Sequence, residues 1–307
     1  MQKKIKAGHS AQYFNNYRDH WWNQSFLETL ASRLSLQQCN DMLDVGCGLC
    51  HWSKLLCPFL ADGAKVFAVD NDPNWAEYAQ DHERYFSERG GSFQFDCASA
   101  DRLPYGDNSF DLVSCQTVLI HVREPEMVIA EMQRVLKPGG TLLCAEPNNQ
   151  VQHLIRSSLS ADASIEETME HVKYALIYEK GKKKYGHGDN SLGDLLPGLL
   201  AQAGLKDIEV RISDKAIAMY PPYDKGEQQA TLQQWAQSSH STPSGVDTKS
   251  YFSIMGKDYL EFYENYHKKY VNKLDQILEA LEDEVYHAAG GALMYVVSAI
   301  KNEKKTN

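Results

Sequence analysis

The chain has 307 residues, of which 43% are hydrophobic and 23% charged, and its formal net charge at pH 7 is -10. No apolar run approaches the roughly 20 residues that span a bilayer, and an acidic balance argues against broad binding to a phosphate backbone. The basic segment Met1–Lys6 lacks the apolar core of a signal peptide, so we expect a cytoplasmic protein of one large domain, with or without an insertion.

The first expected element is an amphipathic helix over residues 13–36. Its aromatic side chains recur at near-helical spacing, which is typical of a helix packed on a sheet. They are Tyr13, Phe14, Tyr17, Trp21, Trp22 and Phe26.

A short apolar strand then runs into a glycine turn, Met42–Cys50. Gly46 and Gly48 carry no side chain that would keep the backbone away from a ligand. The next strand, Lys65–Asp70, ends in a carboxylate. A carboxylate about 20 residues past such a turn is placed to accept both hydroxyls of a ribose. The pattern therefore predicts a site for a nucleoside cofactor.

A nicotinamide cofactor does not fit this turn. The Gly-x-Gly-x-x-Gly pattern requires a third glycine where this chain has His51, a bulky residue that opposes tight packing of helix on strand. The strand also contains Asp44, two positions before the first glycine. A carboxylate there suits a cofactor with a cationic amino-acid tail better than one with a pyrophosphate.

The following elements are expected in regular order. Pro73 begins a helix over 73–89. After it we expect a strand at 92–97, a loop at 99–105, a strand at 110–115, a helix at 124–136 and a strand at 140–146.

Three ordered motifs now lie within residues 42–146: Asp44–Cys50, Ser99–Val113 and Glu131–Leu143. Together they closely resemble the class I S-adenosylmethionine-dependent methyltransferases, in the ubiquinone-biosynthesis-type branch. The resemblance implies an α/β fold: a Rossmann-like, doubly wound sheet of seven mostly parallel strands with an antiparallel last strand. It also implies an enzyme whose cofactor is S-adenosyl-L-methionine.

The resemblance implies a set of cofactor-binding residues. Two departures from the family pattern are Cys50 in place of the third glycine and Ser99 in place of a frequent acidic residue; Asp96 and Asp101 are alternative sources of that carboxylate. Tyr13 and Tyr17 belong to a leading segment that often forms a flap in this family. The cofactor-binding set is Asp44, Gly46, Cys47, Gly48, Asp70, Asn71, Ser99, Ala100, Gln116 and Tyr13.

The seven cysteines are an odd number scattered through strands and helix starts, which does not indicate a disulfide framework. Cys47–His51 matches the c-type haem attachment pattern and contains a Cys-x-x-Cys pair. Haem attachment needs an exported chain, and zinc needs a second ligand pair at suitable spacing. We therefore interpret these cysteines as part of the cofactor turn and expect no metal.

The second half of the chain is less regular. Residues 150–187 show helical periodicity that leads to a loop, Gly181–Asn190, whose lysines we expect to be solvated. A helix at 190–203 ending at Gly204 and strands at 206–213 and 292–300 should follow. About 70 residues without a strand precede the last strand, and so long a loop is improbable.

We therefore expect two units: a Rossmann-like domain of residues 1–222 and 289–307, and a helical insertion, 223–288, that forms a substrate lid. The insertion is rich in aromatic residues, which either staple its helices together or line a substrate cavity. The aromatic residues are Tyr251, Phe252, Tyr259, Phe262, Tyr263, Tyr266 and Tyr270.

The reaction implied by the resemblance is transfer of a methyl group from a sulfonium to a nucleophile in line with it. Candidate catalytic residues are His121 and Glu146 at strand ends and His187 from a loop that could close over the cleft. We expect a small molecule or a peptide side chain as acceptor, not nucleic acid. An RNA or tRNA methyltransferase and a non-catalytic cofactor-binding regulator remain alternatives, and the oligomeric state is open.

Overall fold

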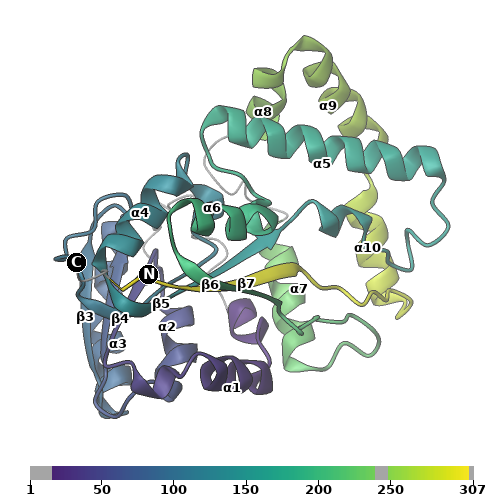
Figure 1. Cartoon of the computed structure of the whole chain (residues 1–307). Helices are drawn as coiled ribbons and strands as arrows, with labels where there is room; N and C mark the ends of the chain where they lie inside the picture. Colours follow the sequence, from purple (N-terminus) through teal and green to yellow (C-terminus); the bar gives the residue numbers. More distant parts are fainter. Residues whose placement is uncertain (1–15, 239–247, 304–307) are drawn as a thin grey trace.

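The computed structural model describes residues 16–238 and 248–303 and is built on one seven-stranded sheet (Figure 1). The strand order is β3-β2-β1-β4-β5-β7-β6. Strands β1 to β5 pair in parallel, and β7 is antiparallel to both β5 and β6, which confirms the predicted fold. The strands are β1 Asp41–Val45, β2 Lys65–Asp70, β3 Ser92–Cys97, β4 Phe110–Gln116, β5 Leu136–Asn148, β6 Lys206–Ile212 and β7 Leu293–Ile300.

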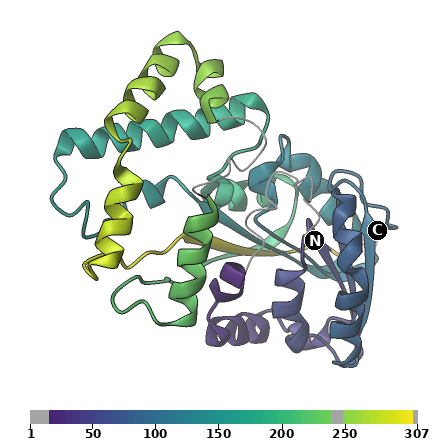
Figure 2. The ribbon, with the colours of Figure 1, turned by 180° about the vertical axis from the view of Figure 1, so that it is seen from behind.

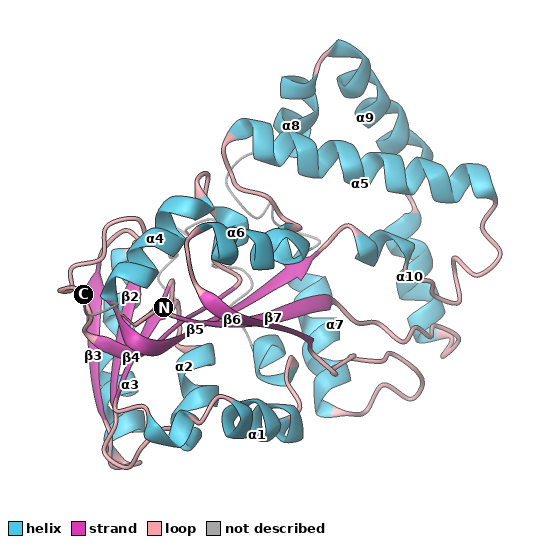
Figure 3. Ribbon diagram, in the orientation of Figure 1, coloured by secondary structure: helices cyan, strands magenta, loops and turns pink. Residues whose placement is uncertain are grey.

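Helices cover both faces of the sheet (Figure 3). One face carries α1 (Gln24–Arg33), α2 (His51–Leu56) and α3 (Ala79–Ser87), and the other carries α4 (Pro125–Val135) and α6 (Leu196–Gln202). Because both faces are covered, the central strands β1 and β4 are buried almost throughout and do not alternate between buried and exposed positions. Within the described ranges, no helix combines the length and apolar character needed to cross a membrane.

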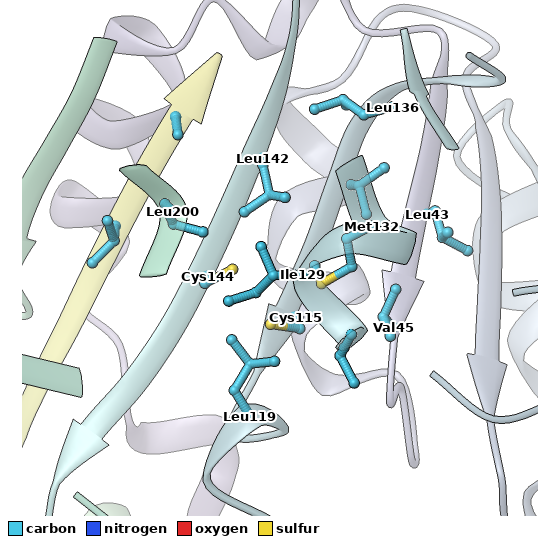
Figure 4. Close-up of a cluster of buried hydrophobic side chains, with 14 of the residues drawn as sticks. Leu43, Val45, Cys115, Leu119, Ile129, Met132, Leu136, Leu142, Cys144 and Leu200 are labelled. Atoms are coloured by element: carbon cyan, nitrogen blue, oxygen red, sulfur yellow. The ribbon is translucent and has the colours of Figure 1, made fainter. Parts of the chain in front are cut away.

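Each face of the sheet has its own apolar core. Figure 4 shows the core beneath α4 and α6, where Ile129 and Met132 of α4 and Leu200 of α6 meet Leu142 and Cys144 of β5. On the opposite face the core contains Leu27, Leu30, Trp52, Leu56 and Phe86. The two cores fix the strands whose ends form the site.

The prediction of one helix over 13–36 is wrong in the part that the structure describes. A 3₁₀ turn, Asn16–His20, is separated from α1 by a break. Two contacts explain the break: Trp22 turns inward onto Trp52 with ring centroids 4.9 Å apart, and Asn23 Nδ2 donates to Asp214 Oδ1 at 3.0 Å. Neither partner is local, so helical spacing alone could not reveal the break.

The lysine-rich stretch after Gly181 is helical, which corrects the predicted loop. Helix α5 runs over Ile165–Tyr185 and ends at Gly186, whose φ of 97° is left-handed. Position 181 lies in the helix interior, and it is a glycine because a Cβ there would overlap the carbonyl oxygen of Tyr251. Lys182 is buried and not solvated. Gly181 and Lys182 therefore belong to the buried, packed side of α5 and not to a solvated loop.

Helices α5, α8 (Thr248–Met255) and α9 (Lys257–Lys269) pack together above the carboxyl end of β5, and we call these three helices the cap (Figures 1 and 2). Aromatic stacking joins them: Tyr174 of α5 lies 4.8 Å from Phe252 of α8 and 4.2 Å from Tyr266 of α9, between ring centroids. The aromatic residues of the insertion thus pack helix on helix.

The expected insertion 223–288 contributes to two packing units. Its α8 and α9 belong to the cap, whereas α7 (Gly226–Ser238) and α10 (Lys273–Glu282) share a separate apolar cluster containing Trp235, Ala280 and Tyr286. Since α5 precedes residue 223, the cap combines helices from inside and outside the expected insertion. The division of the chain at 222 and 289 remains a proposal.

The glycine contacts predict opposite effects of two alanine substitutions. Gly181→Ala should lower the free energy of unfolding by about 1–3 kcal/mol, since the new methyl group overpacks the α5–α8 contact. Gly198→Ala is the control: Gly198 lies in α6 with no atom near its would-be Cβ, so it should raise stability by about 0.5–1 kcal/mol. Urea unfolding measures both; an unchanged midpoint in Gly181→Ala would contradict the contact.

Candidate cofactor and active site

A cavity of about 460 Å³ opens at the carboxyl ends of β1, β2 and β4. The strand order reverses between β1 and β4, and ligands of doubly wound sheets bind at such a switch point. The volume lies within the range of small-molecule sites. The lining residues are Arg18, Gly46, Val69, Asp70, Asn71, Asp72, Trp75, Ala98, Ser99, Ala100, Asp101, Gln116, Thr117, Val118, His121, Val122, Arg123, Glu124 and Val128.

The glycine turn forms one wall. Gly46 has a φ of 68°, and a Cβ on it would lie 2.5 Å from Val118 Cγ2, so only glycine fits between turn and cavity. Cys50 replaces the third glycine of the family pattern at a φ of 58° and directly precedes α2. Its side chain is fully buried with Cys47 and Ala68. A small side chain is accommodated there, and the turn keeps its shape.

Asp70 is fixed at the cavity edge by two backbone amides. Gly48 N donates to its Oδ2 and Asp72 N to its Oδ1, both at 3.0 Å. Burial raises the pKa of Asp70, and these amide hydrogen bonds oppose the rise. A carboxylate can accept about four hydrogen bonds, so lone pairs remain for a diol. This geometry suits the ribose contact expected from the sequence.

Three of the predicted cofactor residues, Asp44, Cys47 and Gly48, lie behind the cavity wall and do not line it. Asp44 is fully buried and accepts a short hydrogen bond from the hydroxyl of Ser53 on α2. Burial raises the pKa of Asp44 to about 7. Asp44 therefore attaches α2 to β1 and supports the turn from behind.

The loop after β3 forms the opposite wall through Ser99, Ala100 and Asp101. Two residues of α4 hold this loop: Glu131 Oε2 accepts from Leu103 N at 2.9 Å, and Arg134 donates to Glu131 Oε1 at 2.7 Å. The second and third sequence motifs are thus in direct contact.

Of the two alternative carboxylates, Asp101 lines the cavity. Asp96 instead accepts from Tyr105 Oη at 2.9 Å, outside the cavity lining.

The end of β4 provides Gln116, Thr117, Val118 and His121. Thr117 has a φ of 54°, a conformation that costs about 1–3 kcal/mol in a residue with a side chain. It directs the chain from β4 into the 3₁₀ turn Leu119–His121. His121 is thereby carried to the cavity.

The three predicted catalytic residues have different surroundings. His121 lines the cavity, whereas Glu146 and His187 do not. Glu146 is fully buried beneath the turn and accepts from the amides of Val118 and Leu119 at 2.9 and 2.8 Å; burial raises its pKa to about 7. His187 Nδ1 lies 2.8 Å from Tyr251 Oη in the cap.

The remaining predicted cofactor residues divide in two groups. Gly46, Asp70, Asn71, Ser99, Ala100 and Gln116 line the cavity. Tyr13 lies outside the described residues.

Five charged or aromatic lining residues were missed by the sequence analysis: Arg18, Asp72, Trp75, Arg123 and Glu124. Arg18 comes from the 3₁₀ turn Asn16–His20, and its guanidinium suits an anionic carboxylate. A basic residue in the leading aromatic segment was the available signal, although nothing local pointed it toward the cavity.

The Cys47–His51 pattern forms no metal site in the described part of the chain, where no group of three or more His, Cys, Asp or Glu side chains is arranged to hold an ion. Burial raises the pKa of Cys47 well above its usual value, so its sulfur stays a thiol. His51 Nδ1 lies 2.8 Å from Asp19 Oδ1. Cys47 and His51 therefore contribute to the structure of the glycine turn and of α2, which follows it.

Comparisons with known proteins indicate the class of the domain. Residues 43–144 match the sequence profile described as a methyltransferase domain. Demethylmenaquinone methyltransferase of Staphylococcus epidermidis is 28% identical over 185 residues, 59% of this chain and 73% of the relative. Methyltransferase GfsG of Streptomyces halstedii is 36% identical over 121 residues, 39% of this chain and 42% of the relative. The chain thus spans under half of the second relative's length.

Among solved structures, phosphoethanolamine N-methyltransferase 2 of Haemonchus contortus, in complex with S-adenosyl-L-methionine, overlays with a TM-score of 0.47 at 15% identity. The overlay covers 98% of this chain and 59% of that chain.

The motifs, the profile match and the curated relatives together define the class: the chain is a class I S-adenosylmethionine-dependent methyltransferase. Its similarity to demethylmenaquinone methyltransferases fits the ubiquinone-biosynthesis-type branch, and its cofactor is S-adenosyl-L-methionine. The residues present fit that cofactor, since the wall at Gly46 leaves no room for a Cβ and the cavity edge offers the Asp70 carboxylate.

Removing the Asp70 carboxylate should weaken cofactor binding. Asp70→Ala is expected to lose about 1–3 kcal/mol of binding free energy for S-adenosylhomocysteine, since ribose hydroxyls would lose a charged acceptor. Calorimetry measures the loss, with Asp81→Ala on the exposed surface of α3 as the control. Normal affinity in Asp70→Ala would refute the ribose contact.

The raised pKa of Asp44 predicts a pH dependence of stability. The folded chain keeps a proton on Asp44 up to a pH of about 7, whereas the unfolded chain loses it near its ordinary pKa of about 4. Stability from this group is therefore present below about pH 4 and lost as the pH rises to about 7.

Asp44→Asn, which cannot ionise, should reduce the loss of unfolding free energy of the ligand-free chain between pH 5 and 7 by about 2 kcal/mol. Urea unfolding at several pH values tests this, with Asp81→Asn as the exposed control. Parallel curves for the wild type and Asp44→Asn would contradict the buried, protonated carboxyl.

Proposed function

We propose that this methyltransferase acts on a small organic molecule that reaches the cofactor cavity between the cap and the carboxyl ends of β4 and β5. The observation that carries this proposal is the contact between the loop that follows α5 and the turn that bears His121. Gly188 lies against this turn so closely that a Cβ would overlap the carbonyl oxygen of Ile120. An acceptor must enter beside this contact, which favours a small molecule over a polymer.

Two further observations support a small acceptor. The net charge of -10 disfavours an RNA substrate. The relatives from Staphylococcus epidermidis and Geobacillus kaustophilus are named for demethylmenaquinone, a small molecule. A reduced demethylated quinone is therefore the first single compound to test.

Bound in this cavity, S-adenosyl-L-methionine supplies an activated methyl group on a sulfonium. Asp70 would bind the ribose hydroxyls, and Arg18, which also lines the cavity, would pair with the carboxylate of the amino-acid tail. Val118, Val122 and Val128 form an apolar lining that excludes water from the reacting atoms. His121 orients the acceptor by a hydrogen bond or takes the proton that the acceptor releases.

The acceptor class is tested with a labelled methyl donor and three separate pools. Label should enter the small-molecule extract, including the reduced demethylated quinone, and should not enter a peptide library or total tRNA. Incorporation only into peptide or tRNA would overturn the small-molecule proposal. Tight S-adenosylhomocysteine binding without turnover in any pool would indicate a regulatory module.

The role of His121 is tested by His121→Ala on the acceptor found in that assay. Loss of a general base or orienting group should lower kcat by about 10²–10⁴-fold while the affinity for S-adenosylhomocysteine stays within a few-fold. His287→Ala is the matched control, because His287 is exposed and does not line the cavity. An unchanged kcat in His121→Ala would exclude His121 from the reaction.

A further inference from the structure

The turn Val118–Val122 is held from below by one buried carboxyl. Glu146 Oε1 accepts from Val118 N at 2.9 Å and Leu119 N at 2.8 Å, and its Oε2 accepts from Ile120 N at 3.4 Å. Three consecutive amides of the turn thus point at Glu146 on β5. This explains how the turn is fixed to the sheet, but not how it meets the cap.

From the cap, one buried lysine reaches the same turn. Lys182 Nζ of α5 donates to Ile120 O at 3.4 Å and to Asn190 Oδ1 at 2.8 Å, and the side chain is 1% exposed. The turn therefore donates its amide hydrogens to the Glu146 carboxyl group and accepts a hydrogen bond from the Lys182 ammonium at the carbonyl of Ile120. Ile120 is held by both.

Burying this ammonium is costly, because lysine is almost never fully buried unless it is paired. Burial lowers the pKa of Lys182 to about 8, and the carboxyl groups of Glu179, Asp189 and Glu146 oppose that decrease. Lys180, Lys183 and Lys184 on the same helix are exposed. Lys182 alone among these four is directed inward, at the turn.

The contact continues from the turn to the rest of the cap. Gly181, next to Lys182, packs against the backbone of Tyr251 on α8, and His187 Nδ1 lies 2.8 Å from Tyr251 Oη. Helix α8, helix α5 and the turn bearing His121 are therefore joined by direct contacts. A shift of α5 would move the ammonium that holds Ile120, the neighbour of His121.

We propose that Lys182 is a positioning residue for methyl transfer, which ties cap helix α5 to the turn that presents His121 to the cavity. Seating of the cap on an acceptor then sets the position of His121. This inference rests on the proposed function for its kinetic consequence. Its structural consequence, a turn that loosens when the ammonium is removed, is independent of the acceptor.

The test compares Lys182→Met with Lys183→Met in the full chain saturated with S-adenosylhomocysteine. Methionine has nearly the length of lysine without the charge. Lys183 pairs with Asp189 on the surface, so its substitution removes a neighbouring charge without touching the turn. Hydrogen exchange at residues 119–122 and the carbon-13 signals of labelled His121 are the readouts.

Lys182→Met should exchange at least tenfold faster at residues 119–122 and shift the His121 signals. Its affinity for S-adenosylhomocysteine should stay within threefold, and Lys183→Met should match the wild type. With the acceptor found above, kcat should fall at least tenfold with little change in KM. Unchanged exchange and unchanged His121 signals in Lys182→Met would overturn the inference, whether or not that acceptor is a quinone.

Two further variants keep the test decisive if Lys182→Met does not fold. Asn190→Ala removes the other partner of the Lys182 ammonium and should loosen residues 119–122 in the same direction. Lys182→Arg, which retains a cation, should restore part of the protection and of kcat. If Asn190→Ala exchanges at residues 119–122 as slowly as the wild type, or if exchange becomes faster evenly over the whole chain, Lys182 has only a general packing role and the inference is wrong.

Discussion

The connection between the glycine turn and the end of β2 is the constraint on which the site depends. Gly46 N and Cys47 N donate to Val69 O at 2.7 and 3.1 Å, and Gly48 N donates to Asp70 at 3.0 Å. These bonds align the turn with the adjacent carboxylate before any ligand arrives. A site with its groups already in place loses less ordering free energy on binding.

Buried carboxyl groups support the glycine turn and the turn after β4 from behind. Asp44 attaches α2 to β1 through Ser53, and Glu146 gathers the amides of the turn after β4. Burial raises both pKa values to about 7. The energetic cost of burying these groups lies in the supporting structure, whereas Asp70 and His121 line the cavity itself.

The sequence predicted the sheet because the signals there are local, and six of the ten expected cofactor-binding residues line the cavity. Glycines at left-handed positions, strand-end acidic residues and the Glu131–Leu143 motif each occupy a short stretch whose geometry follows from its own residues. The seven mostly parallel strands and the antiparallel last strand followed from the family resemblance, and the structure confirms them.

The cap could not be predicted in the same way because its contacts join distant segments. From the sequence, Gly181 indicated the start of a loop, and only its contact with Tyr251 explains why the position has no side chain. Lys182 was expected to be solvated, and only the fold shows that its ammonium contacts Ile120 and Asn190. Glu146 was identified as a strand-end carboxylate, yet only the fold shows that it faces backbone amides and not the cavity.

A crystal structure of the S-adenosylhomocysteine complex tests the central claim most directly. The account predicts that the ribose hydroxyls lie within hydrogen-bonding distance of the Asp70 carboxylate, that the backbone at Gly46 contacts the cofactor, and that the sulfur faces the turn bearing His121. A cofactor whose ribose lies away from Asp70, or whose sulfur points away from that turn, would contradict it.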